Sequence, residues 1–319
     1  MRAVTIANGR ISVEDRPDPV PGPGQLLVRV SAAGLNGADM MQLRGLYPAP
    51  PGVPADIPGM ELAGEVVALG EGSTRHQPGD RVMSLVGGGA QAELAIVDES
   101  VAMPVPAARD WAAAGGFPEV FTTAHDALAS QCQLQSGERL LVTGAAGGVG
   151  TAAVQIGIAI GARVVASVRK PDLRPAMAEL GAEVVDPSEA GAHGPYDVVL
   201  ELVGGPDFEA NLPALAPGGR IAVIGVGGGA RVALDLLTLM GRRARVMGST
   251  LRSRSLEEKA LAARRVEAEL LPLVEAGKLR VIVGEVFGLE SAPDAYARFQ
   301  AGGKMGKIVV ISCALATGS

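Results

Sequence analysis

Cysteine is scarce in this sequence. The 319 residues contain Cys132 and Cys313 alone, which form neither a close C-x-x-C pair nor a framework of the kind that stabilises small secreted domains. The chain runs from Met1 into a short strand-like stretch, Ala3–Ile6, with no apolar segment of signal-peptide length behind it. We therefore expect a reducing, cytoplasmic location, and Cys132 is predicted to be an inert buried thiol.

Aromatic residues and positive charge are also in short supply. One tryptophan, three tyrosines and five phenylalanines leave few platforms for stacked bases, and the formal net charge is −6. Because an acidic chain does not attract polyanions, nucleic acid is not predicted as a partner. The run from Leu140 to Ala162 carries no charge and has the length of a membrane span, but its six glycines favour a buried strand that turns tightly into a helix. No membrane association is predicted.

Proline is concentrated at the amino-terminal end. Thirteen of the 22 prolines lie at or before Pro118, among short apolar runs separated by turns such as Pro21–Gly24. This pattern predicts a small, irregular β domain over residues 1–116. From about Arg139, apolar strands alternate with helices, which is typical of a parallel sheet covered on both faces. We therefore place a second domain at residues 117–250.

The remaining residues, 251–319, begin with a long predicted helix, Leu256–Ala276. Strand-like Val281–Val286 and Lys307–Ile311 follow and flank a further helix, so this tail has the elements to return and complete the first domain. A basic cluster is interpreted as a solvated face, with an anion-contacting role as the alternative; it comprises Arg242, Arg243, Arg245, Arg252 and Arg254.

A glycine turn is the most informative segment of the chain. An apolar strand, a glycine-rich turn and an apolar helix, Thr151–Ile160, occur in the order that a dinucleotide site requires. Gly147 lets backbone approach a pyrophosphate, Gly150 lets the helix pack closely, and the first helical amides face the anion. The predicted cofactor-binding residues of the turn are Gly144, Ala145, Ala146, Gly147, Gly148, Val149 and Gly150.

The end of the next strand favours NADPH over NADH. The acidic residue that would bind a ribose 2′-hydroxyl is missing, and Ser167, Arg169 and Lys170 stand there instead. Donors and cations suit a 2′-phosphate, although a solvated basic turn is the alternative. Loops after the fourth and fifth predicted strands lie at the carboxyl end of the sheet, where ligands bind, and they add Val203, Gly225 and Val226 to the predicted cofactor contacts.

Several motifs in order resemble one known family over almost the whole chain. They are Gly34–Asp39, Arg44–Pro48, Gly59–Val67, Pro78–Val82, Gly87–Glu93, Thr122–Leu128, the glycine turn and Gly306–Val310. In these motifs the sequence is similar to the zinc-independent quinone oxidoreductases of the medium-chain dehydrogenase/reductase superfamily, the relatives of zeta-crystallin. Within that family it looks most like the branch typified by the tumour-suppressor-inducible quinone oxidoreductase. The resemblance implies a Rossmann doubly wound parallel sheet inserted in a GroES-like β-rich domain.

The same resemblance bears on metal and catalysis. Zinc-dependent members carry a Cys ligand where this chain has Asn36 and a Gly-His-Glu where it has Gly59-Met60-Glu61, so no metal site is predicted. Asn36 and Tyr47 match positions that line the cleft beside the nicotinamide, and Thr123 matches a threonine close to the cofactor. A turn residue, a loop anchor and a packed helical threonine are the structural alternatives for these three.

The leading functional hypothesis is an NADPH-dependent quinone reductase. Its same-class alternative reduces the carbon–carbon double bond of enones, enals or enoyl thioesters, because hydride delivery to a conjugated acceptor has the same geometry. A non-catalytic NADPH-binding sensor or RNA binder is the alternative from another class. The resemblance also implies a homodimer that pairs through the last Rossmann strand, Arg245–Gly248.

Overall fold

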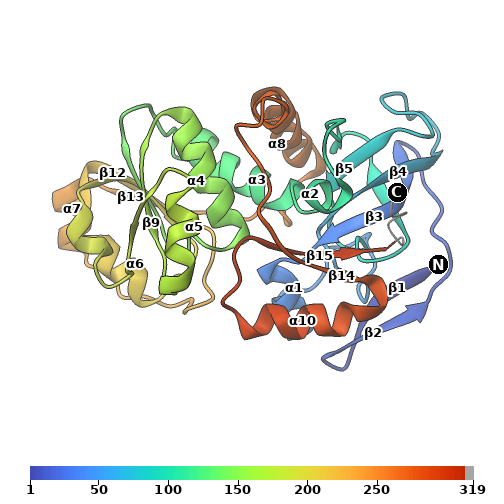
Figure 1. Ribbon diagram of the computed structural model, residues 1–319, viewed down its shortest axis with the longest axis horizontal. Helices are drawn as coiled ribbons and strands as arrows, with labels where there is room; N and C mark the ends of the chain where they lie inside the picture. Colours follow the sequence, from blue (N-terminus) through green and yellow to red (C-terminus); the bar gives the residue numbers. More distant parts are fainter. Residues whose placement is uncertain (313–319) are drawn as a thin grey trace. The chain divides into compact units, whose positions relative to one another are not determined.

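The structure is a computed structural model, and it describes residues 1–312. The chain forms two compact units, of which the first contains residues 1–119 together with the tail from Arg252, and the second contains Val120–Leu251. Figure 1 shows both units coloured along the sequence. Cys313, one of the two cysteines, lies outside the described residues.

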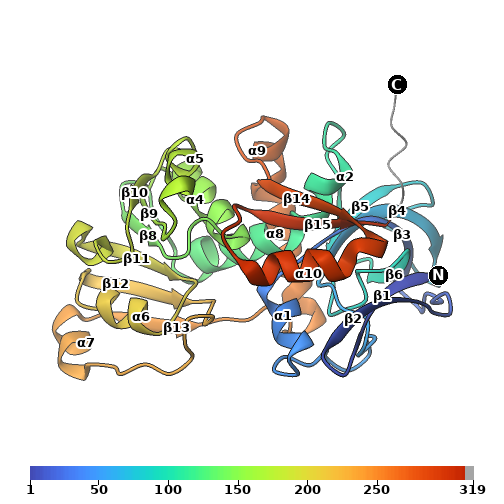
Figure 2. The ribbon, with the colours of Figure 1, turned by 60° about the horizontal axis from the view of Figure 1, so that its bottom comes forward.

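The first unit is built around a seven-stranded sheet to which both ends of the chain contribute. Its path is β14-β15-β3-β4-β5-β7, with β6 paired to β3. Figure 2 shows β14 and β15, drawn in red, beside the blue strand β3. The elements are β1 (Arg2–Ala7), β2 (Arg10–Asp15), β3 (Gln25–Gly34), α1 (Gly37–Leu43), β4 (Glu61–Leu69), β5 (Arg81–Leu85), β6 (Leu94–Asp98), β7 (Ala102–Pro104), α2 (Trp111–Gly115), α8 (Leu256–Glu269), α9 (Leu271–Glu275), β14 (Val283–Gly288), α10 (Ala292–Ala301) and β15 (Lys307–Ile311).

The second unit is a six-stranded parallel sheet in the order β10-β9-β8-β11-β12-β13. In sequence order this is 3-2-1-4-5-6, the doubly wound Rossmann arrangement, whose topological switch point lies between β8 and β11. Its elements are α3 (Pro118–His125, entering from the first unit), a π-helix (Asp126–Gln131), β8 (Arg139–Val142), α4 (Gly148–Ile160), β9 (Arg163–Ser167), α5 (Arg174–Ala178), β10 (Glu183–Val185), β11 (Tyr196–Glu201), α6 (Pro206–Asn211), β12 (Leu215–Val223), α7 (Leu236–Arg242) and β13 (Arg245–Gly248).

These two folds confirm the predicted class, a Rossmann sheet carried with a GroES-like β-rich unit. The buried residues of β8, Leu140–Val142, are apolar on both faces, as a parallel sheet covered by helices requires. None of the helices in residues 1–312 is long and apolar enough to cross a membrane. The uncharged run at 140–162 is divided between β8, the glycine turn and α4.

The predicted helix Leu256–Ala276 is wrong in one respect. The structure divides it into α8 and α9 at Leu270. Pro272 falls in the first turn of α9, where its missing N–H is tolerated, whereas within a continuous helix it would clash with the preceding turn. The single helix is therefore two.

Candidate cofactor and acceptor sites

The glycine turn joins β8 to α4 at the carboxyl end of the Rossmann sheet. Gly144 has a φ of +56°, a conformation that favours glycine. The amide of Gly147 donates to the Gly144 carbonyl at 3.0 Å, which closes the turn, and Gly147 then precedes the first residue of α4. The opening amides of α4 have no acceptor within the helix and can bind an anion.

Gly150 has the packing role predicted from sequence. A Cβ at this position would come within 2.5 Å of the Ala145 carbonyl oxygen, so the helix approaches the turn too closely for any side chain. At Gly147 an added Cβ would meet only the Gly144 oxygen, at 3.4 Å. The turn is therefore tight at Gly150 and open at Gly147, the pattern that a pyrophosphate site requires.

Glu201, at the end of β11, forms hydrogen bonds to residues of three loops. Its role was not predicted from the sequence. Its side chain is fully buried, and one carboxylate oxygen accepts the Thr143 hydroxyl at 2.7 Å and the amides of Val203 and Gly204, each at 2.8 Å. Its backbone carbonyl accepts the amides of Ile224 and Gly225. Glu201 thereby connects the ends of β8, β11 and β12, where the cofactor loops begin. A charged residue that ends an apolar strand is the only signal the sequence offers.

The loops after β11 and β12 are fastened to each other by backbone hydrogen bonds. The Gly228 amide donates to the Val203 carbonyl at 2.8 Å, and a Cβ on Gly225 would come within 2.3 Å of the Leu202 oxygen. Val226 is 38% exposed at the outer end of its loop. The structure thus brings Val203 and Gly225 together beside the glycine turn, with Val226 reaching solvent.

The end of β9 carries the predicted cationic residues. Ser167 is buried and its carbonyl accepts the Ala145 amide, so this strand end adjoins the glycine turn. Arg169 and Lys170 are exposed, and neither forms a hydrogen bond or ion pair through its side chain with any residue in the described part of the chain. By contrast, the nearby Arg174 donates to Asp186 at 2.5 Å and is neutralised.

Thr123 lies within the buried helix α3 and is 8% exposed. A π-helix over Asp126–Gln131 follows this helix directly. Such wide turns occur mostly at functional positions, which agrees with α3 carrying a cofactor contact but does not assign one to Thr123.

Asn36 stands at the start of α1 in the first unit, as the turn-residue alternative requires. Its backbone amide donates to the Asp39 carboxylate at 2.8 Å, and this bond fixes the first turn of the helix. Both polar atoms of the side-chain amide also form hydrogen bonds: Nδ2 donates to Glu61 at 2.9 Å, and Oδ1 accepts from Lys307 at 2.7 Å. Asn36 is therefore both a helix cap and a member of a buried polar cluster.

That cluster contains two acids and one base. Lys307 and Glu61 form an ion pair at 2.5 Å, with side chains 2% and 0% exposed. Asp39 is also fully buried, and burial raises its pKa to about 6, against the opposing effect of the amides of Asn36 and Gly59. In the sequence, Lys307 and Glu61 are recognisable only as parts of family motifs, which predict no role for either.

Tyr47 lies just beyond α1, in a loop held by Arg252. The guanidinium donates to the carbonyls of Gly87 and Tyr47 at 2.8 and 3.1 Å and to Gln42 at 2.7 Å, and it lies over the Tyr47 ring at 5.0 Å. Burial raises the pKa of Tyr47 even though the guanidinium acts in the opposite direction, so the phenol stays protonated. Its hydroxyl has no partner among residues 1–312.

The interpretation of Arg252 as part of a solvated basic face is wrong. Its side chain is buried, because backbone carbonyls and the Gln42 amide replace water around the guanidinium. Arg243 and Arg245, by contrast, flank or lie within β13 in the other unit.

The residues present do not fit a catalytic zinc ion. Such a site needs three N, S or O donors, whereas the Asn36 amide and the Lys307 ammonium already bind the Glu61 carboxylate, and Met60 next to it offers only a thioether. Within residues 1–312, no group of three or more His, Cys, Asp or Glu side chains is placed to hold a metal.

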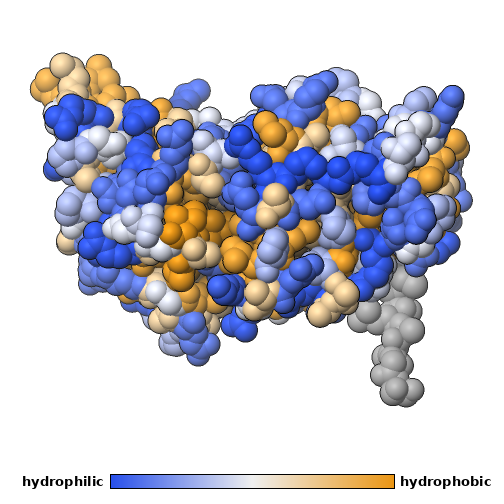
Figure 3. All heavy atoms as spheres, turned by 90° about the horizontal axis from the view of Figure 1, so that it is seen from above, coloured by the Kyte–Doolittle hydropathy of each residue, from blue (hydrophilic) through white to orange (hydrophobic). Residues whose placement is uncertain are grey.

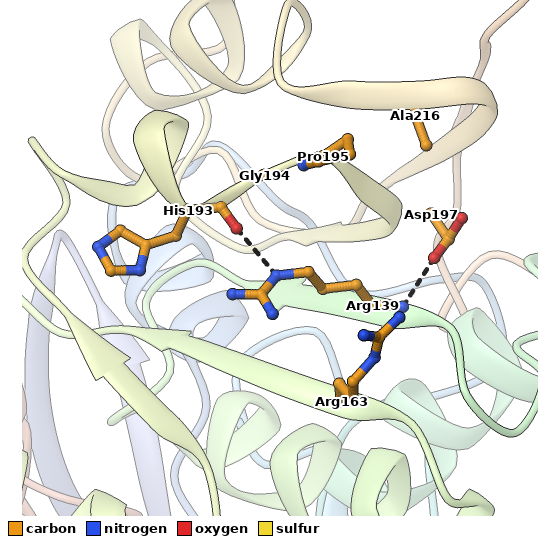
Figure 4. Close-up of a pocket in the computed structure, with 7 residues that line it drawn as sticks. All are labelled: Arg139, Arg163, His193, Gly194, Pro195, Asp197 and Ala216. Carbon is orange, nitrogen blue, oxygen red and sulfur yellow. Dashed lines mark hydrogen bonds between the residues drawn. The ribbon is translucent and has the colours of Figure 1, made fainter.

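A separate hollow of about 580 Å³ lies at the amino ends of the Rossmann strands. Figure 4 shows Arg139 donating through its side chain to the His193 carbonyl and through its backbone to Asp197. Arg139 and His193 both pair with Glu183, and ligands of doubly wound sheets bind at the opposite, carboxyl end. We therefore assign this hollow no part in the cofactor site.

Two family models match the chain: the alcohol dehydrogenase GroES-like domain over residues 22–107 and the zinc-binding dehydrogenase over residues 160–310. A quinone oxidoreductase of Rattus norvegicus is 31% identical over 92% of this chain and 91% of its own. The chain belongs to the medium-chain dehydrogenase/reductase superfamily.

Other members of the superfamily are similar over comparable lengths. An acryloyl-coenzyme A reductase of Metallosphaera sedula is 29% identical, covering 97% of this chain and 99% of its own. The crystal structure of an alcohol dehydrogenase superfamily protein from Novosphingobium aromaticivorans superposes with a TM-score of 0.86 at 32% identity, covering 98% of this chain and all of the other. Because members of this superfamily are pyridine-nucleotide-dependent oxidoreductases that act on small molecules, this protein is one as well.

Proposed function

We propose that this oxidoreductase is an NADPH-dependent quinone reductase that works without zinc. The observation that carries the proposal is the buried Asn36–Glu61–Lys307 cluster, because the resemblance matches Asn36 and the Gly59–Glu61 motif to metal-site positions of zinc-dependent members. Because no Lewis acid activates the acceptor, the acceptor must already be electrophilic, and quinones meet that requirement.

NADPH would be held by the glycine turn, by the loops at Val203 and Gly225, and by Arg169 and Lys170 at its 2′-phosphate. When bound, it supplies a hydride. The protein's own residues then have to position the acceptor and exclude water, with Asn36 and the Tyr47 hydroxyl as donors to acceptor oxygens. A quinone that gains a hydride and one proton from solvent becomes a hydroquinone, so the atoms and electrons balance.

Reduction of a conjugated carbon–carbon double bond is the second candidate. Its support is the similarity to the acryloyl-coenzyme A reductase, since hydride transfer to an enoyl thioester needs the same donors at the carbonyl oxygen.

Steady-state NADPH oxidation with 1,2-naphthoquinone, 1,4-benzoquinone and crotonyl-coenzyme A tests the choice. We expect kcat/KM to be highest for a quinone and to be unchanged after treatment with a chelator. A preference for the thioester of roughly a hundredfold or more, about 2.7 kcal/mol in transition-state binding, would replace the quinone with the second candidate. Absence of turnover with all three acceptors would favour a non-catalytic NADPH sensor.

We also propose a homodimer formed through β13 and a cytoplasmic location. Leu237 and Met240 of α7 are 79% and 71% exposed, and Val246 of β13 is 39% exposed. Large apolar side chains gathered around a sheet edge favour pairing with a second copy. The scarcity of cysteine supports the location.

A further inference from the structure

The Lys307–Glu61 ion pair is almost completely buried, so water solvates neither charge and both depend on hydrogen bonds from the protein. The Lys307 ammonium donates to the Leu35 carbonyl at 2.7 Å in addition to Glu61 and Asn36. The second carboxylate oxygen of Glu61 accepts the Glu119 amide at 2.8 Å. These bonds offset the cost of removing two charges from water, so the pair is stable as a unit and not as separate halves.

The cluster leaves the Asn36 amide one orientation. An ammonium group only donates hydrogen bonds and a carboxylate only accepts them. Lys307 must therefore contact Oδ1, and Glu61 must contact Nδ2, as the structure has them. A flipped amide would turn its NH₂ group toward the ammonium and its oxygen toward the carboxylate, losing both bonds.

This orientation decides what Asn36 can offer to a ligand. Oδ1 is committed to the ammonium, whereas Nδ2 uses one N–H on Glu61 and has only a long contact, 3.4 Å to the Gly34 carbonyl, for the other. Asn36 is thus a donor with one N–H to spare. The charge of Lys307 on Oδ1 also polarises the amide and strengthens that donor.

Close packing keeps the cluster in place. A Cβ on Gly34 would come within 2.3 Å of the Glu61 carboxylate and 2.9 Å of the Lys307 side chain. Glycine at this position therefore lets the ion pair lie directly against the strand that leads to Asn36.

We propose that Lys307 and Glu61 are positioning residues that hold the Asn36 amide as a hydrogen-bond donor to the acceptor oxygen on which negative charge develops during hydride transfer. The inference rests on the proposed function, because it is that reaction which creates charge on a quinone oxygen. A donor fixed before the reaction stabilises such charge without reorganisation. The ion pair thereby performs part of the role that a metal ion has in zinc-dependent relatives.

The test is a double variant, Lys307→Met with Glu61→Gln, which removes both charges of the ion pair together. We expect kcat for a quinone to fall roughly tenfold or more, while the dissociation constant for NADPH stays within about twofold, since oxyanion donors act in the transition state. Lys304→Met is the matched control: Lys304 is half-buried, binds the Gly306 carbonyl and lies over Phe299 at 4.5 Å. It should leave kcat within about twofold.

A double-mutant cycle separates positioning from a merely structural role. If the ion pair acts through Asn36, adding the double variant to Asn36→Ala should lower kcat no further. If the double variant lowers kcat by the same factor in the wild-type and Asn36→Ala backgrounds, the inference is overturned. The proposed quinone reductase activity would still stand. A wild-type protein that reduces no quinone would overturn the proposed function and the inference with it.

A second variant covers the case in which the double variant unfolds. Glu61→Asp keeps a carboxylate for Lys307, so no buried charge loses its partner, but the shorter side chain draws the carboxylate away from Nδ2 of Asn36. We expect it to melt as a folded protein with kcat lowered roughly threefold to tenfold. Unchanged kcat in folded Glu61→Asp protein would overturn the orientation argument.

Discussion

Two exposed cations at the end of β9, Arg169 and Lys170, form no hydrogen bond or ion pair through their side chains within the described part of the chain. We predict that Arg169→Ala with Lys170→Ala raises KM for NADPH much more than KM for NADH, because only NADPH carries the 2′-phosphate. A charge-assisted contact contributes about 1.5–3 kcal/mol, which corresponds to a rise of roughly tenfold or more. Steady-state kinetics with each nucleotide measures the difference.

Arg174 supplies the control for this prediction. It lies close by but already binds Asp186 and the Val168 carbonyl, so it has little to offer a phosphate. Arg174→Ala should change KM for the two nucleotides by the same factor. If KM for NADPH rises less than threefold in the Arg169/Lys170 variant, the 2′-phosphate assignment is contradicted.

Single residues were predictable where their partners are close in sequence and hidden where they are distant. The glycine turn is local, and Gly150 packs as its spacing predicts. The partner that fixes Asn36 is Lys307, 271 positions away, and no periodicity connects the two. The prediction that Arg252 is solvated was wrong for a similar reason, since its burial depends on Gln42, which lies 210 positions earlier. Tertiary contacts of this kind exist only once the fold has formed.

Among the elements, β11 has the largest effect on the cofactor site, through Glu201 at its end. We predict that Glu201→Gln weakens NADPH binding roughly tenfold and lowers the melting temperature. The neutral amide cannot match a carboxylate that accepts one hydroxyl and two backbone amides, and charge-assisted bonds are about twice as strong as neutral ones. Fluorescence titration with NADPH and a thermal melt measure the two effects.

Glu183→Gln is the matched control for this prediction, because Glu183 lies at the opposite, amino end of the sheet. It begins β10 on the surface, where it binds Arg139 and His193. Glu183→Gln should leave NADPH affinity within about twofold. If both variants bind NADPH as the wild type does, Glu201 does not organise the cofactor loops.

Element boundaries were predictable where composition and position agree. β13 and β15 have the limits expected from their apolar runs. The residue pattern of Phe208–Leu215 alone predicts a helix, but the structure ends α6 at Asn211 and begins β12 at Leu215. Leu215 pairs with Tyr196 across a register shift, and this long-range pairing overrides the local helical preference.

At the scale of the whole molecule, the joining of the two chain ends was predictable because the tail contains strands without partners of their own. The structure pairs Val309–Ile311 of β15 antiparallel with β3. The mode of assembly is not predictable from sequence in the same way, since it depends on which backbone groups of an edge strand face outward.

The alternation of hydrogen bonds fixes the outward groups of β13. Ser249 donates its amide to the Val223 carbonyl of β12, and N–H groups alternate in direction along a strand. The amides of Arg245 and Met247 therefore face β12, whereas the amide of Val246 faces away from the sheet. In the described chain β13 has no partner other than β12. Figure 3 shows apolar side chains gathered at the end of the second unit where α7 lies.

We predict a homodimer in which β13 pairs antiparallel with its two-fold mate, with the interface centred on residues of about 230–248. Val246→Pro removes an outward donor and keeps the bonds to β12, so it should give folded monomers that still bind NADPH weakly. Leu237→Lys should also dissociate the dimer, because Leu237 is 79% exposed on α7, whereas Leu261→Lys on α8, 55% exposed, should not. Light scattering at micromolar concentration measures the mass of each variant. A monomeric wild type, or a proline variant that remains fully dimeric, would show that this edge is not the interface.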